Sequence, residues 1–438
     1  MSFIVRSSLD LLSPDMCKAW RSGDFRMVRN LNPGSKSKEK AMQRDVTASV
    51  FLDDRRVGVL GYHDGNTWFD YTDLSAEHPV LGQGFERDPR KRRSGSGSVP
   101  EWFANLLPEP GSGLRHMIAT ELSKKKLHDF VLLSHLGEDL PGAVRVVPDV
   151  PLDGLPDHEP TSVCEHEHAL RFSLAGVQPK FSMRYEGKAL VLPATGSGGD
   201  WIVKLPDQRF PAVPENEFAM LQWAGRAGID VPESHLVPGT LIRNLPEGTI
   251  GPDEHALAIR RFDRTDDGRV HQEDFAQVRE VSAEAKYDKA NYEGIGRVIS
   301  AVCPVEDAVE YLRRLAAFTL MGNADAHLKN WTLRYPTVRQ ARLSPAYDLV
   351  CVTAYPKADH KLAFPLGGNT NTELITTESF RGLSPALRLS PELITDTVRE
   401  TVEALTASWS GIKNDFEVPE FVAVTIDSRL ASLPLVRG

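Results

Sequence analysis

The sequence is poor in cysteine, and the few cysteines that it has are scattered. Its 438 residues include four of them: Cys17, Cys164, Cys303 and Cys351. None forms a C-x-x-C pair, which excludes a disulfide framework and a paired-cysteine zinc site. A run of ~18 apolar residues, the length needed to cross a membrane, is also missing. The first residues lack the basic start of a signal peptide and reach Asp10 early. We therefore expect a cytosolic protein.

A positive net charge is absent as well. Lys and Arg number 51 against 60 Asp and Glu, so the formal net charge is −9. This balance argues against a general nucleic-acid binder. The basic run between Arg87 and Arg93 is the local exception. It is interpreted either as a solvated loop, which we favour slightly, or as a contact to DNA phosphates or an acidic partner. Hydrophobic residues at 41% and charged residues at 25% are typical of a folded globular chain.

Two common ligand-binding patterns fail on inspection. The glycines of Gly196–Gly199 do not form a dinucleotide loop, because Trp201 stands where the third glycine belongs, and no Gly-Lys-Ser/Thr follows. A turn between strands is the better interpretation. Cys164, His166 and His168 are metal-ligand residue types, but no second ligand cluster lies near them in the sequence. We interpret that segment as an exposed loop.

The pattern along the chain predicts an α+β protein in three parts. Residues 1–45 form an extension of unknown role. Residues 46–155 are a small β-rich subdomain with two helical segments, and Asp53-Asp54 is a turn signal between its first two strands. The proline-rich stretch from Pro148 to Pro160 marks its end. Residues 156–438 form a bilobal core, with a β-rich lobe over about 160–265 and a mostly helical lobe over about 290–438. Within it we predict a helix from Val305 to Met321, stopped by Gly322, and mainly helices beyond Tyr355.

The strongest chemical signal is the segment Asn323-Ala-Asp-Ala-His-Leu-Lys-Asn330. An Asp followed five positions later by an Asn is the spacing of a protein-kinase catalytic loop. Phosphoryl transfer needs a carboxylate beside the attacking hydroxyl and oxygen ligands for Mg²⁺. Asp325 and Asn330 have these residue types at this spacing. Asp348, in LSPAYDLV, lies where a second metal-binding Asp is expected, although no Phe-Gly follows it.

Upstream residues supply the other parts of an ATP site in the order of a kinase. Lys204 lies in the predicted strand WIVKLP, where a charged amine needs a partner, and Glu217 on the following helix is placed to provide it. The segment Leu174–Lys180 precedes them and is placed to cradle phosphates with its backbone N–H groups. Each element alone has an ordinary structural explanation. Their common order favours a kinase that uses ATP and Mg²⁺.

These segments resemble the HipA family of serine/threonine kinase toxins of type II toxin–antitoxin systems. The resemblance rests on FSLAGVQPKF, DWIVKLP, ENEFAMLQWA, RRFDR, NADAHLKN and LSPAYDL, with EWFANLLPE in the N-terminal subdomain, and covers residues 46 to 430 approximately. It implies a catalytic base at Asp325, Mg²⁺ ligands at Asn330 and Asp348, and autophosphorylation at Ser173. It also implies that the following residues bind or order the nucleotide: Gly176, Val177, Gln178, Lys180, Lys204, Glu217, Phe262, His327 and Lys329.

The resemblance implies partners as well as chemistry. A small helix-turn-helix antitoxin, similar to HipB, would bind the chain and link it indirectly to operator DNA. The phosphorylated substrate would be an aminoacyl-tRNA synthetase or another translation component. Ala175 replaces a second serine found in some members, and Arg260 stands where a Glu is often found in the hinge. Two alternatives remain open from the residues: a small-molecule kinase, and a non-catalytic nucleotide-binding co-repressor.

Overall fold

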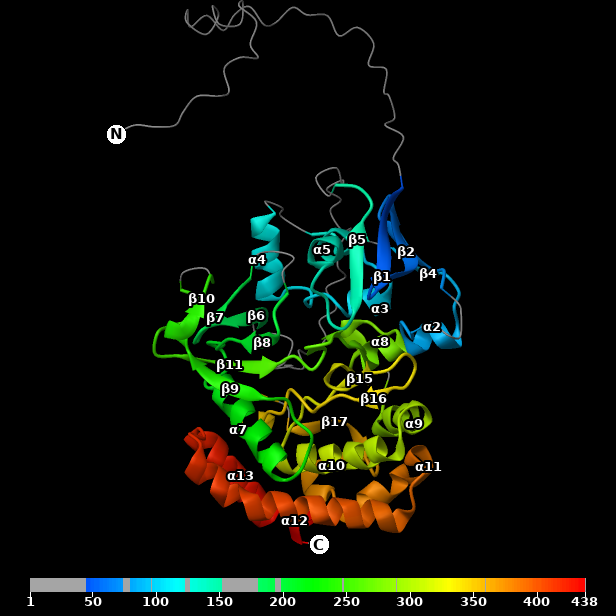
Figure 1. Cartoon of the computed structure of the whole chain (residues 1–438). Helices are drawn as coiled ribbons and strands as arrows, with labels where there is room; N and C mark the ends of the chain where they lie inside the picture. The colour runs from blue at the N-terminus through cyan, green and yellow to red at the C-terminus, as the bar shows by residue number, and fades with distance from the viewer. Residues whose placement is uncertain are drawn as a thin grey trace, which may run out of the picture. The chain divides into compact units, whose positions relative to one another are not determined.

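The structure is a computed structural model, shown in Figure 1. It describes residues 45–73, 79–95, 97–122, 127–151, 180–193, 198–245, 248–288, 290–358 and 360–437. The chain divides into the units 1–44 and 45–438, and all described residues belong to the second. The predicted extension therefore lies outside the described residues, except for Asp45. Among the described helices, none combines the length and apolar character needed to span a bilayer.

Residues 45–151, here called the N-terminal region, are built on a five-stranded antiparallel sheet with the order β4-β3-β2-β1-β5. The predicted hairpin is confirmed: β1 and β2 pair across Asp53-Asp54, and Asp53 has a φ of 53°. The strands are β1 (Val46–Leu52), β2 (Arg55–His63), β3 (Asn66–Tyr71), β4 (Arg92–Ser94) and β5 (Val144–Pro148). The helices are α2 (Gln83–Arg87), α3 (Glu101–Ala104), α4 (Gly113–Glu121) and α5 (Asp129–Leu136).

A second, six-stranded sheet has the order β10-β7-β6-β8-β11-β9. Its strands are β6 (Lys180–Glu186), β7 (Ala189–Val191), β8 (Trp201–Lys204), β9 (Ser234–Pro238), β10 (Ile242–Arg243) and β11 (His255–Arg260). Helix α7 (Val213–Arg226) lies against β9 and β11 (Figure 1). Lys204 ends β8, between Lys180 of β6 and Leu257 of β11. The predicted strand WIVKLP and the predicted helix after it are thus confirmed.

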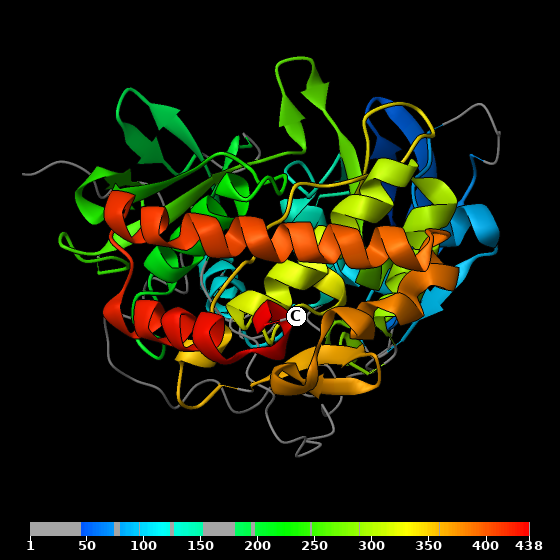
Figure 2. The same cartoon turned by 90° about the horizontal axis from the view of Figure 1, so that it is seen from below.

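The rest of the described chain is mainly helical. The long α12 and the shorter α13 both lie against α10, and Figure 2 shows α12 in orange across the view with α13 in red to one side of it. The helices are α8 (Phe275–Arg279), α9 (Tyr292–Val302), α10 (Val305–Met321), α11 (Ser384–Leu387), α12 (Pro391–Asp415), α13 (Glu420–Ser432) and α14 (Pro434–Arg437). Small sheets pair β12 (Arg264–Thr265) with β13 (Gly268–Arg269), and β14 (His271–Asp274) with β15 (Thr332–Tyr335) and β16 (Arg342–Leu343). Helix α10 has the predicted bounds, and Gly322 ends it at a φ of 70°, a conformation that glycine adopts without strain.

The prediction of mainly helices beyond Tyr355 missed a hairpin. Strands β17 (Lys361–Leu366) and β18 (Asn369–Asn371) pair antiparallel across Gly367-Gly368. Both glycines have positive φ, 58° and 82°, as a tight two-residue hairpin turn requires. The hairpin matters below because β17 forms one wall of a pocket.

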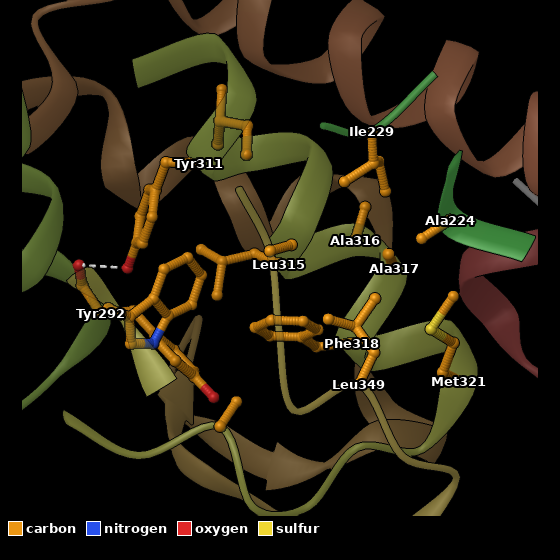
Figure 3. Packing of buried hydrophobic residues seen from close by; sticks show 14 of the residues in the cluster. Ala224, Ile229, Tyr292, Tyr311, Leu315, Ala316, Ala317, Phe318, Met321 and Leu349 are labelled. Carbon is orange, nitrogen blue, oxygen red and sulfur yellow. Dashed lines mark hydrogen bonds between the residues drawn. The ribbon is translucent and has the colours of Figure 1, made fainter. Parts of the chain in front are cut away.

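A large hydrophobic core lies beneath the loop that carries the candidate catalytic residues. In Figure 3, Tyr311 and Phe318 of α10 point into this core, and the Tyr311 hydroxyl donates to the Tyr292 carbonyl at 2.8 Å. The buried Trp331, directly after that loop, packs against both rings at 4.7 and 5.2 Å between centroids. Helix α10 and this aromatic packing therefore hold both ends of the loop.

A buried carboxylate connects the N-terminal region to the rest of the chain. Glu273 is fully buried. One of its oxygens accepts from the Gln83 backbone N–H at 2.8 Å and the Tyr335 hydroxyl at 2.6 Å, and the other accepts from Trp102 Nε1 at 3.2 Å. Burial raises the pKa of Glu273 to about 7, although these three donors act in the opposite direction.

This shift predicts a pH-dependent stability. The pKa of Glu273 is higher in the folded chain, about 7, than its ordinary value of 4.5, so folding favours the protonated acid. The stability that Glu273 contributes is fully present below pH 4.5 and is lost as the pH rises through 7. This loss lowers the free energy of unfolding by about 3 kcal/mol. We expect Glu273→Gln to flatten this dependence in urea unfolding measured from pH 5 to pH 8. The exposed Glu392 serves as the control in Glu392→Gln, and an equal slope in both variants would contradict the assignment.

Candidate active site

Three charged side chains predicted from the sequence meet in the buried interior. The Lys204 amine lies 2.7 and 2.8 Å from the two oxygens of Glu217 and also donates to Asp348 Oδ1. All three residues are at least nine-tenths buried. The Asp348 backbone N–H donates to Glu217 at 3.2 Å, which closes the group into a ring of contacts. The predicted pairing of Lys204 with Glu217 is confirmed as a contact.

The charges in this group change one another's protonation. Burial alone would lower the pKa of the Lys204 amine, but Asp348 and Glu217 raise it above its ordinary value. Burial alone would raise the pKa of Asp348. The positive charges of Lys204 and Lys180 outweigh burial and hold this pKa below its usual range. Burial raises the pKa of Glu217, against the opposing charge of Lys204. Lys204 is therefore a permanent cation at neutral pH, and Asp348 is ionised.

The backbone at Asp348 is held in an uncommon conformation. Its φ is 54°, in the left-handed region that a non-glycine residue rarely adopts. The Asn323 side chain donates to the Asp348 carbonyl at 3.0 Å and accepts from the Asp325 backbone N–H at 3.1 Å. Asn323 therefore ties the two candidate aspartates together. Asn323 begins the sequence motif that contains Asp325 and Asn330, but no role was predicted for it.

Asp325 lies in the loop with its carboxylate facing a pocket. The Tyr287 hydroxyl donates to Asp325 Oδ1, and His327 Nε2 lies 3.7 Å from the same oxygen. Asn330 donates to the Asp325 carbonyl at 2.8 Å, so the predicted five-residue spacing corresponds to a direct contact. The pocket has a volume of about 380 Å³, and its lining includes Tyr287, Asp325 and residues of β17.

His327 and Lys329 lie around Asp325 in different ways. Burial, together with the charges of Lys286, Lys329 and Lys180, lowers the pKa of His327 well below its ordinary value, so the ring is neutral at pH 7. The Lys329 amine donates to the Asn105 carbonyl at 3.0 Å and to its side-chain oxygen at 3.1 Å. It also lies 3.2 Å from Asp274. These contacts fit the expected ordering of the loop, while nucleotide contact by either residue stays a prediction.

The segment RRFDR is more firmly packed than a simple hinge would require. The Phe262 ring lies 5.7 Å from that of Tyr347, next to Asp348, which places it near the site. Arg261 and Arg264 each donate a hydrogen bond to Asp263 at 2.8 Å. They also donate to Asp139 of the N-terminal region, Arg261 at 2.8 Å and Arg264 at 3.0 Å. Four of the segment's residues thus join the β-sheet to the N-terminal region or the site. Adenine contact at Phe262 stays a prediction.

The predicted phosphate loop lies mostly outside the described residues. Only its last residue, Lys180, is placed, opposite Lys204 on the neighbouring strand. Gly176, Val177, Gln178 and Ser173 belong to the part of the chain that the structure does not describe. Cys164, His166 and His168 are outside it as well. Among described residues, no group of three or more His, Cys, Asp or Glu is positioned to hold a metal ion.

The candidate Mg²⁺ ligands nevertheless have suitable chemistry. Mg²⁺ prefers oxygen ligands, and it is commonly held by one or two protein side chains together with substrate phosphates and water. The Asn330 side-chain nitrogen donates a hydrogen bond to the Asp325 carbonyl, and its side-chain oxygen takes no part in that hydrogen bond. Asp348 uses one carboxylate oxygen for Lys204. The residues present therefore fit a magnesium ion that completes its coordination with nucleotide phosphates.

The basic run from Arg87 to Arg93 is only partly a solvated loop. Arg92 begins β4 and lies 2.8 Å from Glu280, and the interpretation as a solvated loop is wrong for this residue. Arg90 pairs with Asp88, and Lys91 lies 3.4 Å from Asp70. Arg87, Arg90 and Arg93 remain exposed. Contact of these exposed arginines with DNA stays a prediction.

Comparison with known proteins gives two family matches. Residues 48–147 match the HipA N-terminal domain, and residues 172–409 match the HipA-like C-terminal domain. A Sinorhizobium fredii protein named "Putative kinase Y4dM" is 43% identical over 385 residues, covering 85% of this chain and 93% of its own. The "Serine/threonine-protein kinase toxin HipA" of Shewanella oneidensis is 27% identical over 370 residues, covering 74% of this chain and 79% of its own.

A solved structure shares the fold. It is that of the Shewanella oneidensis HipA, HipB and operator DNA complex, with a TM-score of 0.67 and 22% identity. The match covers 88% of this chain and 96% of that one. The arrangement of sheets and helices described above is therefore that of a known fold.

Proposed function

This chain belongs to the HipA family, and from that premise we propose that it is an ATP- and Mg²⁺-dependent serine/threonine protein kinase. The observation that carries the proposal is the contact of Lys204 with both Glu217 and Asp348, joined through Asn323 to Asp325. A strand lysine held by a helix glutamate, beside two loop aspartates, is the arrangement that phosphoryl transfer uses. Relatives named as kinases support the same activity.

The chain's own residues would divide the chemistry as follows. Lys204, positioned by Glu217, binds the ATP phosphates. Asn330 and Asp348 would hold Mg²⁺, which would supply positive charge to offset the negative charge on the phosphates during transfer. Asp325 accepts the proton of the acceptor hydroxyl as that oxygen bonds to the γ-phosphorus. The bond from the γ-phosphorus to the bridging oxygen breaks, and ADP leaves. The six-stranded sheet and the helical part would be the two lobes that enclose the nucleotide.

The proposal extends to regulation and partners. Ser173 precedes the phosphate loop, and we place the autophosphorylated residue there. A HipB-like antitoxin is the proposed partner, because the solved structure that shares the fold contains HipA with HipB and operator DNA. DNA would then be reached through that antitoxin. The proposed substrate is an aminoacyl-tRNA synthetase or another translation component, and the division at 155/156 separates the two proposed domains.

Mass spectrometry tests the kinase proposal directly. Purified chain, first treated with a phosphatase, is incubated with Mg-ATP and analysed by intact mass and peptide mapping. We expect one added phosphate on Ser173, absent in Ser173→Ala and retained in the control Ser162→Ala. An unmodified chain that binds ATP and consumes it only with a metabolite would support a small-molecule kinase. An unmodified chain that consumes no ATP would support the co-repressor.

A further inference from the structure

Two residues of the N-terminal region reach the catalytic loop from outside the kinase-like core. Asn105 lies just after α3, and Glu109 follows four positions later. Neither belongs to the residue pattern that predicted the active site. Asn105 contacts Lys329 of the loop itself, and Glu109 contacts Lys286, the residue before Tyr287, whose hydroxyl contacts Asp325.

Asn105 holds the loop itself. Its backbone and side-chain oxygens both accept from the Lys329 amine, at 3.0 and 3.1 Å. Its own side-chain nitrogen donates to the carbonyls of Glu101 at 2.9 Å and Val281 at 2.8 Å. The Asn105 carboxamide is buried and bonded at both ends, so its orientation is fixed. Lys329 lies between Asp325 and Asn330 in sequence, so this contact restrains both candidate residues.

Glu109 holds the segment that contacts the Asp325 carboxylate. Its side chain lies 2.9 Å from the amine of Lys286, which is almost fully buried. The Lys286 carbonyl accepts from the Leu328 backbone N–H at 3.4 Å. The next residue is Tyr287, whose hydroxyl donates to Asp325 Oδ1. A path of direct contacts and one peptide bond thus runs from Glu109 through Lys286 and Tyr287 to Asp325.

We propose that Asn105 and Glu109 are positioning residues for phosphoryl transfer, acting through Lys329 and through Lys286–Tyr287 on Asp325. The inference rests on the proposed kinase function and adds a role in catalysis for the N-terminal region. Other contacts already join that region to the core, among them Arg92 with Glu280 and Trp102 with Glu273. The Asn105 and Glu109 contacts differ from these because one ends on the catalytic loop and the other on the segment that contacts Asp325. A displacement of about 1 Å in such a group is enough to cost roughly 10²-fold in rate.

The test separates positioning from simple stability. In Asn105→Ala with Glu109→Ala we expect kcat to fall roughly 10- to 100-fold, with KM for ATP within about 2-fold of the parent. The control is Arg92→Ala, which removes a contact of the same interface that involves neither the loop nor Lys286. It should lower the melting temperature comparably and leave kcat unchanged. An equal loss of kcat in the control, or none in the double variant, overturns the proposal.

A double-mutant cycle tests the route. If Glu109 acts through Lys286, then adding Glu109→Ala to Lys286→Met should cause no further loss of kcat. Additive losses overturn the path. A parent chain without transferase activity would refute the proposed function separately. Hydrogen–deuterium exchange then still decides the positioning: residues 323–330 should exchange faster in the Asn105 and Glu109 variants than in Arg92→Ala, and equal exchange overturns it.

Discussion

Replacing Asp325 by Asn should slow phosphoryl transfer by orders of magnitude while leaving the fold and nucleotide binding intact. The substitution keeps the size of the side chain, and its carbonyl oxygen can still accept from the Tyr287 hydroxyl that contacts Oδ1. It removes the oxygen that we propose as the proton acceptor in the transition state. Loss of a positioned base typically lowers the rate by ~10²–10⁴. We expect kcat to fall within that range.

The measurement compares rate, binding and stability in one preparation. Transfer from radiolabelled ATP gives kcat, a fluorescent nucleotide gives the dissociation constant, and thermal unfolding reports the fold. Asp288→Asn is the matched control, because Asp288 is an exposed carboxylate on the same pocket. Near-parent activity in Asp325→Asn would remove this residue from the mechanism. An equal loss in the control would show that the pocket's charge, not the base, sets the rate.

Replacing Lys204 by Met should cost both activity and stability. The amine is the shared counter-ion of Glu217 and Asp348, and all three side chains are buried. Removing one member of a buried ion pair typically lowers the free energy of unfolding by about 3–5 kcal/mol, because a charge is left uncompensated. Because Lys204 is the proposed phosphate-binding cation, its loss should lower kcat/KM by at least about 10²-fold.

The stability loss should depend on pH, with a sign that follows from the two carboxylates. Without Lys204, burial and mutual repulsion raise the pKa of the remaining carboxylates above their unfolded values. Stability is then present at low pH and is lost as the pH rises through the raised pKa. We expect Lys204→Met to melt closer to the parent at pH 5 than at pH 8. Lys188→Met, at an exposed position in the turn between β6 and β7, is the control. A pH-independent loss in Lys204→Met would contradict the assignment.

Local signals predicted much of the fold. Helix α10 follows from apolar residues at helical spacing and a glycine stop, and the β1–β2 hairpin follows from its turn residues. The β17–β18 hairpin was missed although Gly367-Gly368 is a recognised turn signal, because the strands around it are short and flanked by helical sequence. Arg92 was misjudged because its burial depends on Glu280, 188 positions away.

Some residues of the candidate site could be predicted from the sequence, and others could not. Phosphoryl transfer needs certain residue types in a fixed order, so the sequence predicted that Lys204, Glu217, Asp325, Asn330 and Asp348 act together. The structure brings them into two groups of contacts joined by Asn323. Tyr287 and Asn105 were not predicted, since a tyrosine or an asparagine has many structural uses. Tyr287 lies 38 positions from Asp325, and Asn105 lies 224 positions from Lys329. No local pattern reports such contacts, because only the packed tertiary structure brings these residues together.

The contacts of Asn105 and Glu109 also bear on how this chain can be recombined with its relatives. The two family matches, over residues 48–147 and 172–409, suggest independent modules. Yet the Glu109–Lys286 and Asn105–Lys329 contacts each join a residue of the first module to a residue of the second. A chimera that takes its first module from one relative and its second from another inherits only half of each contact. Such a chimera keeps these contacts only where the two parents carry compatible residues at both ends of each contact. These two contacts therefore limit which modules can be exchanged between relatives.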